Sequence, residues 1–440
     1  MRRAAWWASI VLVLVSCAAP APTSAPGDAE TARRELPPPT HAGVTRDAAP
    51  SIALVESWPA ETTLDQPDIP DASEVWLARI RGATRALDIA QFYISDAPGS
   101  RLGPVLREVE AAAARGVAVR VLVDETFRGR YPESVERLAR QPGIAVRHFD
   151  GRQTMGGVLH AKYFLVDGRE VYLGSQNFDW RALEHIHEIG LRVQSPAVAS
   201  AFASAFALDW ALAGGAPAPP RGSPEARGTA PAMPVEVLQD GEAVRLWPVG
   251  SPEGFLPDGL PWDLPRLREL IDGAKQSVQV QLLTYRPASR DGTPFLELDR
   301  ALRQAAARGV AVRLIVADWS KRKDTIEGLQ RLAEVPGVEI KMTTIPRWSG
   351  GFVPFARVTH AKYLVVDGRV AWVGTSNWEG DYFTKSRNVG LIVEGGAIPR
   401  RLDRLFLDLW RGRYVAAVDP RATYVPPRID SDAPPAPASP

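Results

Sequence analysis

Apolar residues recur at helical spacing and then merge into apolar runs at two places far apart in the chain. Residues 75–95 predict a helix followed by a buried strand, and residues 266–287 repeat this pattern. A helix end, a glycine that stops it and an apolar strand follow at residues 111–125 and again at 304–318. Strands that alternate with helices predict an α/β fold with a mainly parallel sheet covered on both faces, here in duplicate. A repeat of this length indicates a duplicated domain rather than a solenoid unit.

A hairpin is predicted at the end of each copy. The runs HAKYFLVD and VYLGSQN flank Gly168-Arg169, and the runs HAKYLVVD and AWVGTSN flank Gly368-Arg369. If these residue pairs form two-residue turns, the polar residues that begin each hairpin lie opposite the polar residues that end it.

Polar side chains are therefore expected to converge at the open end of each hairpin. In the first copy Lys162 is expected to face Ser175, and His160 to face Asn177. Side chains two residues apart on a strand share a face, so the four groups form one patch. The second copy repeats the set with Lys362, Thr375, His360 and Asn377. Two copies of one set predict a single site built from two halves.

The chemistry of this set suits a phosphate oxyanion. Lysine offers a point charge, asparagine and serine or threonine offer directed donors, and histidine can act as nucleophile or proton carrier. Two lysines can neutralise the phosphate charge, so neither a metal nor another cofactor is expected. A lone histidine is more often a hydrogen-bonded core residue, but repetition of the whole set argues against that interpretation here.

The repeated motifs resemble the signature of the phospholipase D superfamily, which is H-x-K-x4-D with a downstream G-[ST]-x-N. Both copies match it at every position, and the resemblance extends over roughly residues 52 to 420. GSQNFDWRAL in the first copy, with PFARVTHAKY and GTSNWEGDYF in the second, is similar to the animal lysosomal phospholipase D-like branch and its poxviral relatives. The resemblance implies two α/β sandwich halves related by a pseudo-two-fold axis, with the active site at their interface.

The resemblance also implies the roles of the motif residues. One histidine attacks phosphorus to form a phosphohistidine, and the other protonates the leaving oxygen. These histidines would be His160 and His360, assisted by Lys162 and Lys362. The residues expected to bind the substrate phosphate are Ser175, Asn177, Thr375 and Asn377.

One acidic residue distinguishes the two halves. Glu188 lies 28 residues after His160, and Asn388 stands at the same offset from His360. In members of the family an acidic residue near this offset hydrogen-bonds the histidine ring, and a carboxylate on one ring nitrogen raises the nucleophilicity of the other. We therefore expect His160 to be the nucleophile and His360 the general acid. A reversed assignment stays open, as does the interpretation of Glu188 as a solvated loop carboxylate.

Two other polar pairs are assigned structural roles. Asp167 and Asp367 belong to the signature but lie at the hairpin turns, so turn stabilisation or a buried ion pair is expected rather than catalysis. His185 and His187 form an H-x-H pattern without a third ligand nearby, so no metal site is predicted there.

The N-terminus is similar to a bacterial lipoprotein signal. Residues 1–16 carry Arg2, Arg3 and a short apolar run, followed by Leu14-Val15-Ser16-Cys17. This predicts cleavage before Cys17, lipidation of that residue and anchoring at the cell envelope, facing the periplasm or the exterior, on the outer membrane in a diderm source. A plain secretory peptide is the alternative. Cys17 is the only cysteine, so no intrachain disulfide is possible.

Composition marks the segments outside the two halves. Residues 17–50, 213–234 and 425–440 are rich in Ala and Pro and predict a disordered tether, a linker and a disordered tail. The first half then spans 51–212 and the second 235–424. The formal net charge of +1 gives no global electrostatic footprint for nucleic acid, and nothing in the sequence indicates an obligate protein partner.

The substrate is the least determined part of the prediction. Anchoring at a membrane favours a phospholipase D-like phosphodiesterase or phosphatidyltransferase that acts on phospholipids. The alternative is a single-strand nucleic-acid exonuclease with the same mechanism, because the similar branch includes such enzymes. A non-catalytic lipid-binding lipoprotein is a minor alternative, since both motifs are complete. Several aromatic residues beside the motifs could contact bases or lipids but are expected to be mostly core: Phe178, Trp180, Trp378, Tyr382 and Phe383.

Overall fold

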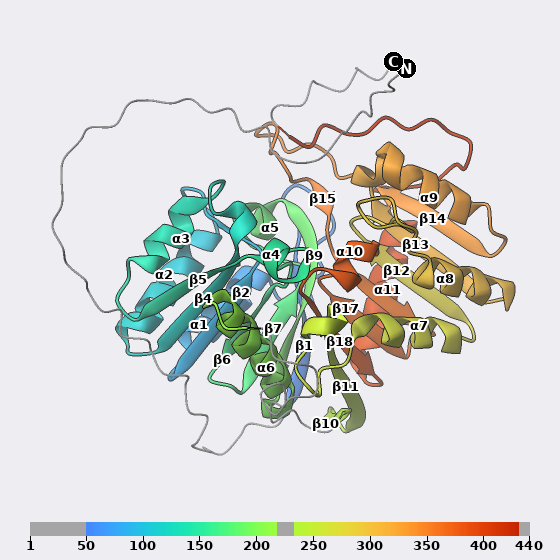
Figure 1. Cartoon of the computed structure of the whole chain (residues 1–440). Coiled ribbons are helices and arrows are strands. Elements are labelled where there is room, and N and C mark those ends of the chain that lie inside the picture. Colours follow the sequence, from blue (N-terminus) through green and yellow to red (C-terminus); the bar gives the residue numbers. More distant parts are fainter. Residues whose placement is uncertain (1–49, 218–232, 431–440) are drawn as a thin grey trace, which may run out of the picture. The chain divides into compact units, whose positions relative to one another are not determined.

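The computed structural model describes residues 50–217 and 233–430, drawn in colour in Figure 1. The predicted signal segment, Cys17, nearly all of the tether, most of the linker and the end of the tail lie outside the described residues. The first half begins with a strand at Ser51 and the second with a strand at Val235.

Strands and helices alternate through the first half. Its strands are β1 (Ser51–Ser57), β2 (Ala86–Gln91), β3 (Ile94–Ser95), β4 (Ala118–Asp124), β5 (Ile144–Phe149), β6 (Tyr163–Val166), β7 (Glu170–Gly174), β8 (Phe178–Asp179) and β9 (Ile186–Gln194). Its helices are α1 (Ala72–Arg81), α2 (Leu102–Ala114), the 3₁₀ helix η1 (Glu125–Phe127), α3 (Pro132–Ala139), α4 (Gly151–Met155), α5 (Trp180–Glu184) and α6 (Pro196–Ala213).

The second half repeats this order after one added strand, β10, with β11 in the place of β1. Its strands are β10 (Val235–Gln239), β11 (Glu242–Ser251), β12 (Ser277–Leu282), β13 (Ala311–Ala317), β14 (Val338–Thr343), β15 (Val358–Thr359), β16 (Tyr363–Val366), β17 (Val370–Gly374), β18 (Asn388–Glu394) and β19 (Val415–Ala417). Its helices are η2 (Glu253–Phe255), α7 (Asp263–Gly273), α8 (Glu297–Ala307), η3 (Asp318–Lys321), α9 (Lys323–Ala333), α10 (Gly380–Thr384) and α11 (Ala397–Arg411). The predicted duplication is therefore confirmed.

The two large sheets are mixed, so the prediction of mainly parallel sheets is wrong. The first has the order β1-β9-β7-β6-β2-β4-β5 and the second β10-β11-β18-β17-β16-β12-β13-β14-β19. Within these two strand orders, parallel pairing is confined to β2-β4-β5 and β12-β13-β14, where helices make the crossovers. The short strand β15 of the second half also pairs in parallel with β9. In each motif hairpin the chain reverses direction and pairs with the strand before it, and the strand that follows the hairpin does the same. These pairs are therefore antiparallel.

The register of the motif hairpins also differs from the prediction by one residue. Tyr163 pairs with Leu173, and the amide of Gly174 donates to the carbonyl of Lys162. The reason is that Asp167 adopts a left-handed conformation (φ 54°) and joins the turn, so that three residues connect the strands instead of two. The second hairpin is built in the same way, with Asp367 at φ 53°.

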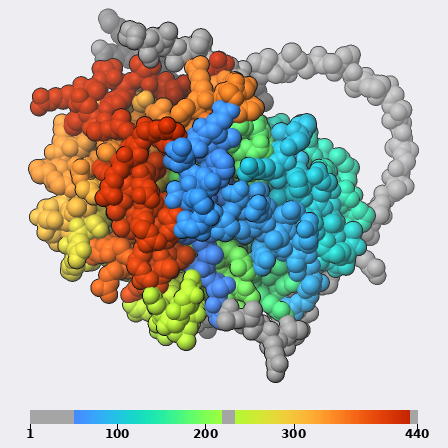
Figure 2. All heavy atoms as spheres, turned by 180° about the vertical axis from the view of Figure 1, so that it is seen from behind, coloured from blue at the N-terminus to red at the C-terminus, as the bar shows by residue number. Residues whose placement is uncertain are grey.

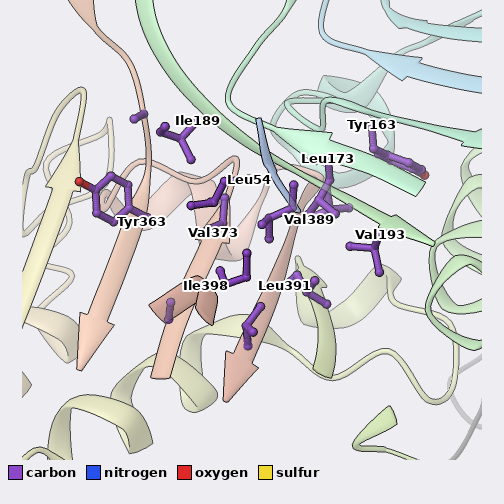
Figure 3. Close-up of a cluster of buried hydrophobic side chains, with 14 of the residues drawn as sticks. Leu54, Tyr163, Leu173, Ile189, Val193, Tyr363, Val373, Val389, Leu391 and Ile398 are labelled. Atoms are coloured by element: carbon purple, nitrogen blue, oxygen red, sulfur yellow. The ribbon is translucent and has the colours of Figure 1, made fainter. Parts of the chain in front are cut away.

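Each sheet buries both faces. The outer faces pack on α1, α2 and α3 in the first half and on α7, α8 and α9 in the second, which Figure 1 shows as separate helical layers. The inner faces, with α6 and α11, share one hydrophobic cluster that runs from Tyr163 in β6 through Leu173, Val389 and Val373 to Tyr363 in β16 (Figure 3). A core that is continuous between the halves holds their facing strand ends in fixed positions.

The segment after β1 contributes to the contact between the halves. Arg401 on α11 donates to both carboxylate oxygens of Asp68, at 2.6 Å each. In the view of Figure 2 the residues of α11, in red, lie beside the segment after β1, in blue. The helix α6 has the length and apolar composition of a membrane span, but its buried side packs in the inner core.

One further boundary, at the C-terminal tail, is fixed by two contacts. The sequence predicts a disordered tail from residue 425, and this prediction is wrong for the residues up to 430. The carbonyl of Ile429 accepts the amide of Phe355 at 2.8 Å. Asp430 also lies 4.0 Å from the guanidinium of Arg130 in the first half. Backbone and ionic contacts therefore order residues up to 430, the last that the structure describes in this segment.

Candidate active site

The segment before each motif histidine pairs with a strand of the other half. The amide of His160 donates to the carbonyl of Arg387 at 2.9 Å, while the amide of Arg387 donates to the carbonyl of Val158 at 2.9 Å. In the second half β15 pairs in parallel with β9, and the amide of His360 donates to the carbonyl of His187 at 2.8 Å. The contacts are reciprocal, as a pseudo-two-fold axis between the halves requires. They bring both histidines to one interface.

Close approach of the backbones requires a glycine at this crossing. A Cβ atom on Gly157 would lie 2.3 Å from the carbonyl oxygen of Lys385 and 2.4 Å from Oγ of Ser386. Both distances are far below van der Waals contact, so a side chain at this position would force the two segments apart. The position therefore affects the placement of His160, three residues later.

The ring of His160 is oriented by an amide. Nδ1 lies 3.0 Å from Oδ1 of Asn388. The orientation of that amide follows from its other contacts, because Nδ2 donates to the carbonyl of Tyr382 at 2.8 Å and Thr375 donates its hydroxyl to Oδ1 at 2.9 Å. Oδ1 is thus an acceptor, and Nδ1 of His160 carries the proton. The lone pair of a neutral His160 ring is then on Nε2.

The ring of His360 is oriented by the carboxylate of Glu188, and the prediction that Glu188 orients His160 is wrong. Oε2 of Glu188 lies 2.8 Å from Nδ1 of His360. The physical reason is the crossed pairing, which sets β9 of the first half against the His360 segment instead of the His160 segment. Glu188 is fully buried, so the alternative of a solvated loop carboxylate is also excluded. Burial raises the pKa of Glu188, but His360 and Lys362 outweigh it and hold that pKa below its ordinary value.

The two motif lysines are buried beside the histidines. Lys162 Nζ donates to the carbonyl of His160 at 2.6 Å, and Lys362 Nζ donates to the carbonyl of His360 at 2.5 Å. Burial lowers the pKa of Lys362 to about 7, although the carboxylate of Glu188 opposes the shift. Burial also lowers the pKa of Lys162, and the charge of Lys362 lowers it further. Two ammonium groups that disfavour each other in a buried site favour an anion between them.

The same environment acts on the histidine rings. Burial lowers the pKa of His160 well below its usual value, and the charges of Lys162 and Lys362 add to the effect. Burial lowers the pKa of His360 as well, but here Glu188 acts in the opposite direction. The site thus holds one imidazole that stays neutral and one whose charged form has a carboxylate partner.

The hydroxyls of the motifs support the orienting residues. Ser175 Oγ accepts the amide of Ile189 at 3.1 Å, and Thr375 Oγ1 accepts the amide of Val389 at 3.1 Å. The two hydroxyls fix the starts of β9 and β18, where the histidine partners stand. By contrast, Oδ1 of Asn177 and Oδ1 of Asn377 are buried and accept no hydrogen bond from the described residues. Phosphate binding stays a prediction for all four residues, and the asparagines would have to bind through Nδ2, since an amide oxygen cannot donate to a phosphate.

The motif aspartates stabilise the turns, as predicted. The carboxylate of Asp167 accepts the backbone amides of Thr84, Arg85 and Ala86. That of Asp367 accepts the amides at the equivalent place in the second half, from Lys275, Gln276 and Ser277. Each aspartate ties its hairpin to the start of the neighbouring strand, β2 or β12.

The H-x-H pair belongs to the interface rather than to the chemistry. His187 Nδ1 lies 3.2 Å from Oγ1 of Thr359, and His185 packs against Trp180 and Trp348. Burial lowers the pKa of both histidines to about 4. Within residues 50–217 and 233–430 no group of three or more His, Cys, Asp or Glu side chains is arranged to hold a metal ion.

Three groups beside the site were not singled out from the sequence. Asp124, at the end of β4, accepts the amide of Leu159 at 2.6 Å and so anchors the residue before His160. Asp209 and Arg387 form a fully buried ion pair. No motif or spacing in the sequence marks these three residues, because their contacts join elements that are far apart in the chain.

The aromatic residues near the motifs are mostly core, as expected. Phe178, Trp378 and Phe383 are buried in the outer cores, and Trp180 packs on His185. Tyr382 is the exception, with its ring centroid 4.9 Å from that of His160.

Comparison with known proteins agrees with this architecture. Residues 76–210 and 267–410 match the family described as cardiolipin synthase, PLD-like domain. The chain is 31% identical over 403 residues to the 5'-3' exonuclease PLD3 of Macaca fascicularis, covering 84% of this chain and 81% of the relative. It is 28% identical to the human 5'-3' exonuclease PLD4, covering 84% and 79%. A phosphatidylserine synthase structure from Haemophilus influenzae shares the fold, with a TM-score of 0.56 at 13% identity, over 78% of this chain and 85% of that one.

The chain belongs to the phospholipase D superfamily, and it is a phosphodiesterase of that superfamily. The family match covers both motif copies, and the two α/β halves are the duplicated fold of the family.

Proposed function

We propose that this enzyme degrades single-stranded nucleic acid from the 5′ end through a phosphohistidine intermediate. The observation that carries the choice of substrate is its similarity to 5'-3' exonucleases across both halves, at 30 to 31% identity over 84% of the chain. The buried pair of histidines with two lysines supplies the chemistry, and it does so without a metal.

The assignment of roles rests on the two ring partners. His160 is the nucleophile, because its amide partner and the neighbouring lysines keep the ring neutral with the lone pair on Nε2. His360 is the general acid, because Glu188 stabilises the imidazolium that must donate a proton. These roles agree with the sequence prediction, but the reason differs, since the carboxylate supports the acid and not the nucleophile.

The reaction then proceeds in two steps. Nε2 of His160 attacks phosphorus, the bond from phosphorus to the leaving oxygen breaks, and His360 transfers its Nε2 proton to that oxygen. His360, now neutral, removes a proton from a water molecule whose oxygen attacks phosphorus. The phosphorus–nitrogen bond breaks, the product leaves as a phosphate monoester, and both rings return to their starting states. Lys162 and Lys362 neutralise the charge on the phosphoryl oxygens throughout.

A phospholipid is the second candidate substrate. The matched family carries the description of a cardiolipin synthase domain, and the predicted lipid anchor at Cys17 would hold the enzyme at a membrane. Attack by glycerol instead of water in the second step would give phosphatidyl transfer with the same residues.

The two substrates are separated by one pair of assays. The full chain in detergent, with chelator present, is given 5′-hydroxyl single-stranded DNA in one tube and phosphatidylglycerol vesicles with glycerol in another. Stepwise release of nucleotides in the first tube alone is the expected result. Phosphatidic acid or a transfer product in the second tube alone would replace the proposal with the lipid function. The matched controls are His160→Ala and His360→Ala, which should be inactive in whichever tube the wild type is active.

A further inference from the structure

Four aromatic rings extend from the nucleophile toward the surface. The ring centroid of Phe92, just after β2, lies 5.0 Å from that of His160 and 4.6 Å from that of Phe127 in η1. Tyr131 lies almost parallel to Phe127, with 8° between the planes and 5.8 Å between the centroids. Tyr93 fills the space between them, 4.8 Å from Phe127 and 5.2 Å from Tyr131. All four residues are only partly buried.

Hydrogen bonds hold these rings in place. The hydroxyl of Tyr93 donates to Oδ2 of Asp179 at 2.7 Å. Asp179 is paired with Arg181, whose guanidinium also lies 3.4 Å from the hydroxyl of Tyr131. A buried ion pair thus fixes both tyrosines before any ligand arrives, which reduces the entropy lost on binding.

Two exposed arginines alternate with the outer rings. The segment reads Phe127-Arg128-Gly129-Arg130-Tyr131, and the side chains of Arg128 and Arg130 are 63% and 43% exposed. Each has a carboxylate partner at the surface, Glu125 at 3.3 Å from Arg128 and Asp430 at 4.0 Å from Arg130, which a phosphate would have to displace or share. Aromatic faces interleaved with cations are the usual surface for a single strand, because bases stack on the rings and phosphates pair with the charges. An acyl chain would gain nothing from the two exposed charges.

Among the described residues of the second half, 233–430, the positions equivalent to Phe92, Tyr93 and Phe127 carry no aromatic side chain. Phe92 and Tyr93 follow β2 as Leu283 and Thr284 follow β12, in strands with matching registers. An Arg-Gly pair follows both α2 (Arg115-Gly116) and α8 (Arg308-Gly309). Ser320 lies as many residues after the second pair as Phe127 lies after the first, so Ser320 is the equivalent of Phe127. The cluster therefore lies only on the His160 side, so the site can distinguish one side of the scissile phosphate from the other.

We propose that Phe92, Phe127 and Tyr131 form a stacking platform for bases of the strand next to the scissile phosphodiester, and that Arg128 and Arg130 contact neighbouring phosphates of the strand. This inference rests on the proposed exonuclease function and names the part of the enzyme that recognises the strand. It explains how an enzyme with a net charge of only +1 can hold a polyanion, since the cations needed are local.

The test compares cleavage of base-bearing and abasic strands. Single-stranded 5′-hydroxyl oligonucleotides carry either normal nucleotides or abasic residues at the first two positions, and kcat/KM is measured for each. The wild type should prefer the base-bearing strand by about tenfold, the scale of one stacked base. In Phe127→Leu this ratio should fall to about twofold or less, and Phe127→Trp should retain it.

The matched control is Trp319→Leu, which removes an aromatic side chain from η3, the equivalent 3₁₀ helix of the second half. It should keep the wild-type ratio. Circular dichroism melting confirms that each variant is folded. A wild-type ratio near one, or an unchanged ratio in Phe127→Leu, would overturn the platform while leaving the exonuclease function intact. Failure of the wild type to cleave any strand would instead overturn both.

The arginines are tested by salt dependence. For binding of a non-cleavable phosphorothioate strand, the slope of log K against log salt should become shallower by about 0.7 for each phosphate that the protein no longer neutralises. Arg128→Gln with Arg130→Gln should therefore reduce it by about 1.4. The pair Arg266→Gln with Arg268→Gln, on the outer helix α7, is the control and should leave the slope unchanged. Equal slopes in all three proteins would exclude the phosphate contacts.

Discussion

Glu188 and His360 are hydrogen-bonded across the interface between the halves, with Oε2 2.8 Å from Nδ1, although 172 residues separate them in the chain. The reciprocal contact joins His160 to Asn388, which is the residue equivalent to Glu188 in the second half. Each half therefore supplies one histidine and orients the histidine of the other. Neither half contains a complete set by itself, so the duplication is functional as well as structural.

The first prediction concerns the charge of Glu188. In Glu188→Gln the imidazolium of His360 loses its anionic partner, so the pKa of His360 falls. The protonated acid then disappears at lower pH, and the alkaline limb of the kcat profile shifts toward acid. We expect kcat to decrease by roughly 10- to 100-fold, as for other residues that orient a catalytic ligand. A pH–rate series for kcat measures both effects.

Asn388→Asp is the matched variant on the other side of the site. It places a carboxylate on His160 and raises the pKa of that ring, so protonation removes the nucleophile at the acid end of the profile. The acid limb should move toward neutral pH while the alkaline limb stays in place. If both variants shifted the same limb, the two histidines would not have the separate roles assigned to them.

The second prediction concerns the covalent intermediate. With a p-nitrophenyl ester of a nucleotide, the leaving group needs no proton, so His360→Ala should still form the phosphohistidine. The variant lacks the base that activates water, so the intermediate should accumulate on His160. Intact-protein mass spectrometry should detect the added nucleotidyl group in His360→Ala and not in His160→Ala. Accumulation in the His160 variant instead would reverse the assignment.

The sequence predicted the parts of the site better than their arrangement. His160, Lys162 and their repeats were identified because a motif that occurs twice has a local spacing that chance does not produce. Asp167 was correctly placed at a turn, because it directly precedes the Gly168-Arg169 pair in the chain. There its carboxylate accepts the amide of Arg85 at the start of the neighbouring strand. The register was wrong by one residue because the left-handed conformation of Asp167 is set by those tertiary contacts.

The partner of Glu188 could not be found from the chain alone. An offset of 28 residues identifies two equivalent positions but not which ring each one contacts. That choice depends on the crossed pairing of β15 with β9 and of Leu159 with Arg387. Pairing between two backbone segments in different halves leaves no periodic trace in the sequence, and the same holds for the aromatic cluster of Phe92 and Phe127.

The third prediction follows from the pKa of Lys362, which burial lowers to about 7. A bound phosphodiester favours the charged ammonium, so the bound enzyme stays protonated at a pH where the free enzyme has lost the proton. Binding above pH 7 therefore requires proton uptake, and the affinity should fall by up to about tenfold per pH unit. Titration of a non-cleavable phosphorothioate dinucleotide between pH 6 and 9 measures this change.

Lys362→Arg provides the control, because a guanidinium stays charged over the whole range. Its affinity for the phosphorothioate should vary less with pH than that of the wild type above pH 7. An affinity of the wild type that is constant up to pH 9 would show that Lys362 is already charged in the free enzyme.

The last prediction concerns the buried ion pair of Asp209 on α6 with Arg387. Both side chains are fully buried, and Arg387 also donates to the carbonyls of Ser251 and Phe255. Its own carbonyl accepts the amide of His160, so the pair links the fold of both halves to the position of the nucleophile. Asp209→Asn leaves an uncompensated buried charge, and we expect it to lower the free energy of unfolding by about 3–5 kcal/mol.

A second variant separates stability from positioning. Replacing the pair by Asp209→Leu with Arg387→Met removes both charges and should recover most of the stability, measured by urea denaturation. Because the methionine donates to none of the carbonyls that fix this segment, kcat should stay below the wild-type value even when the protein is stable. Full recovery of kcat along with stability would show that the ion pair holds the halves together without any effect on His160.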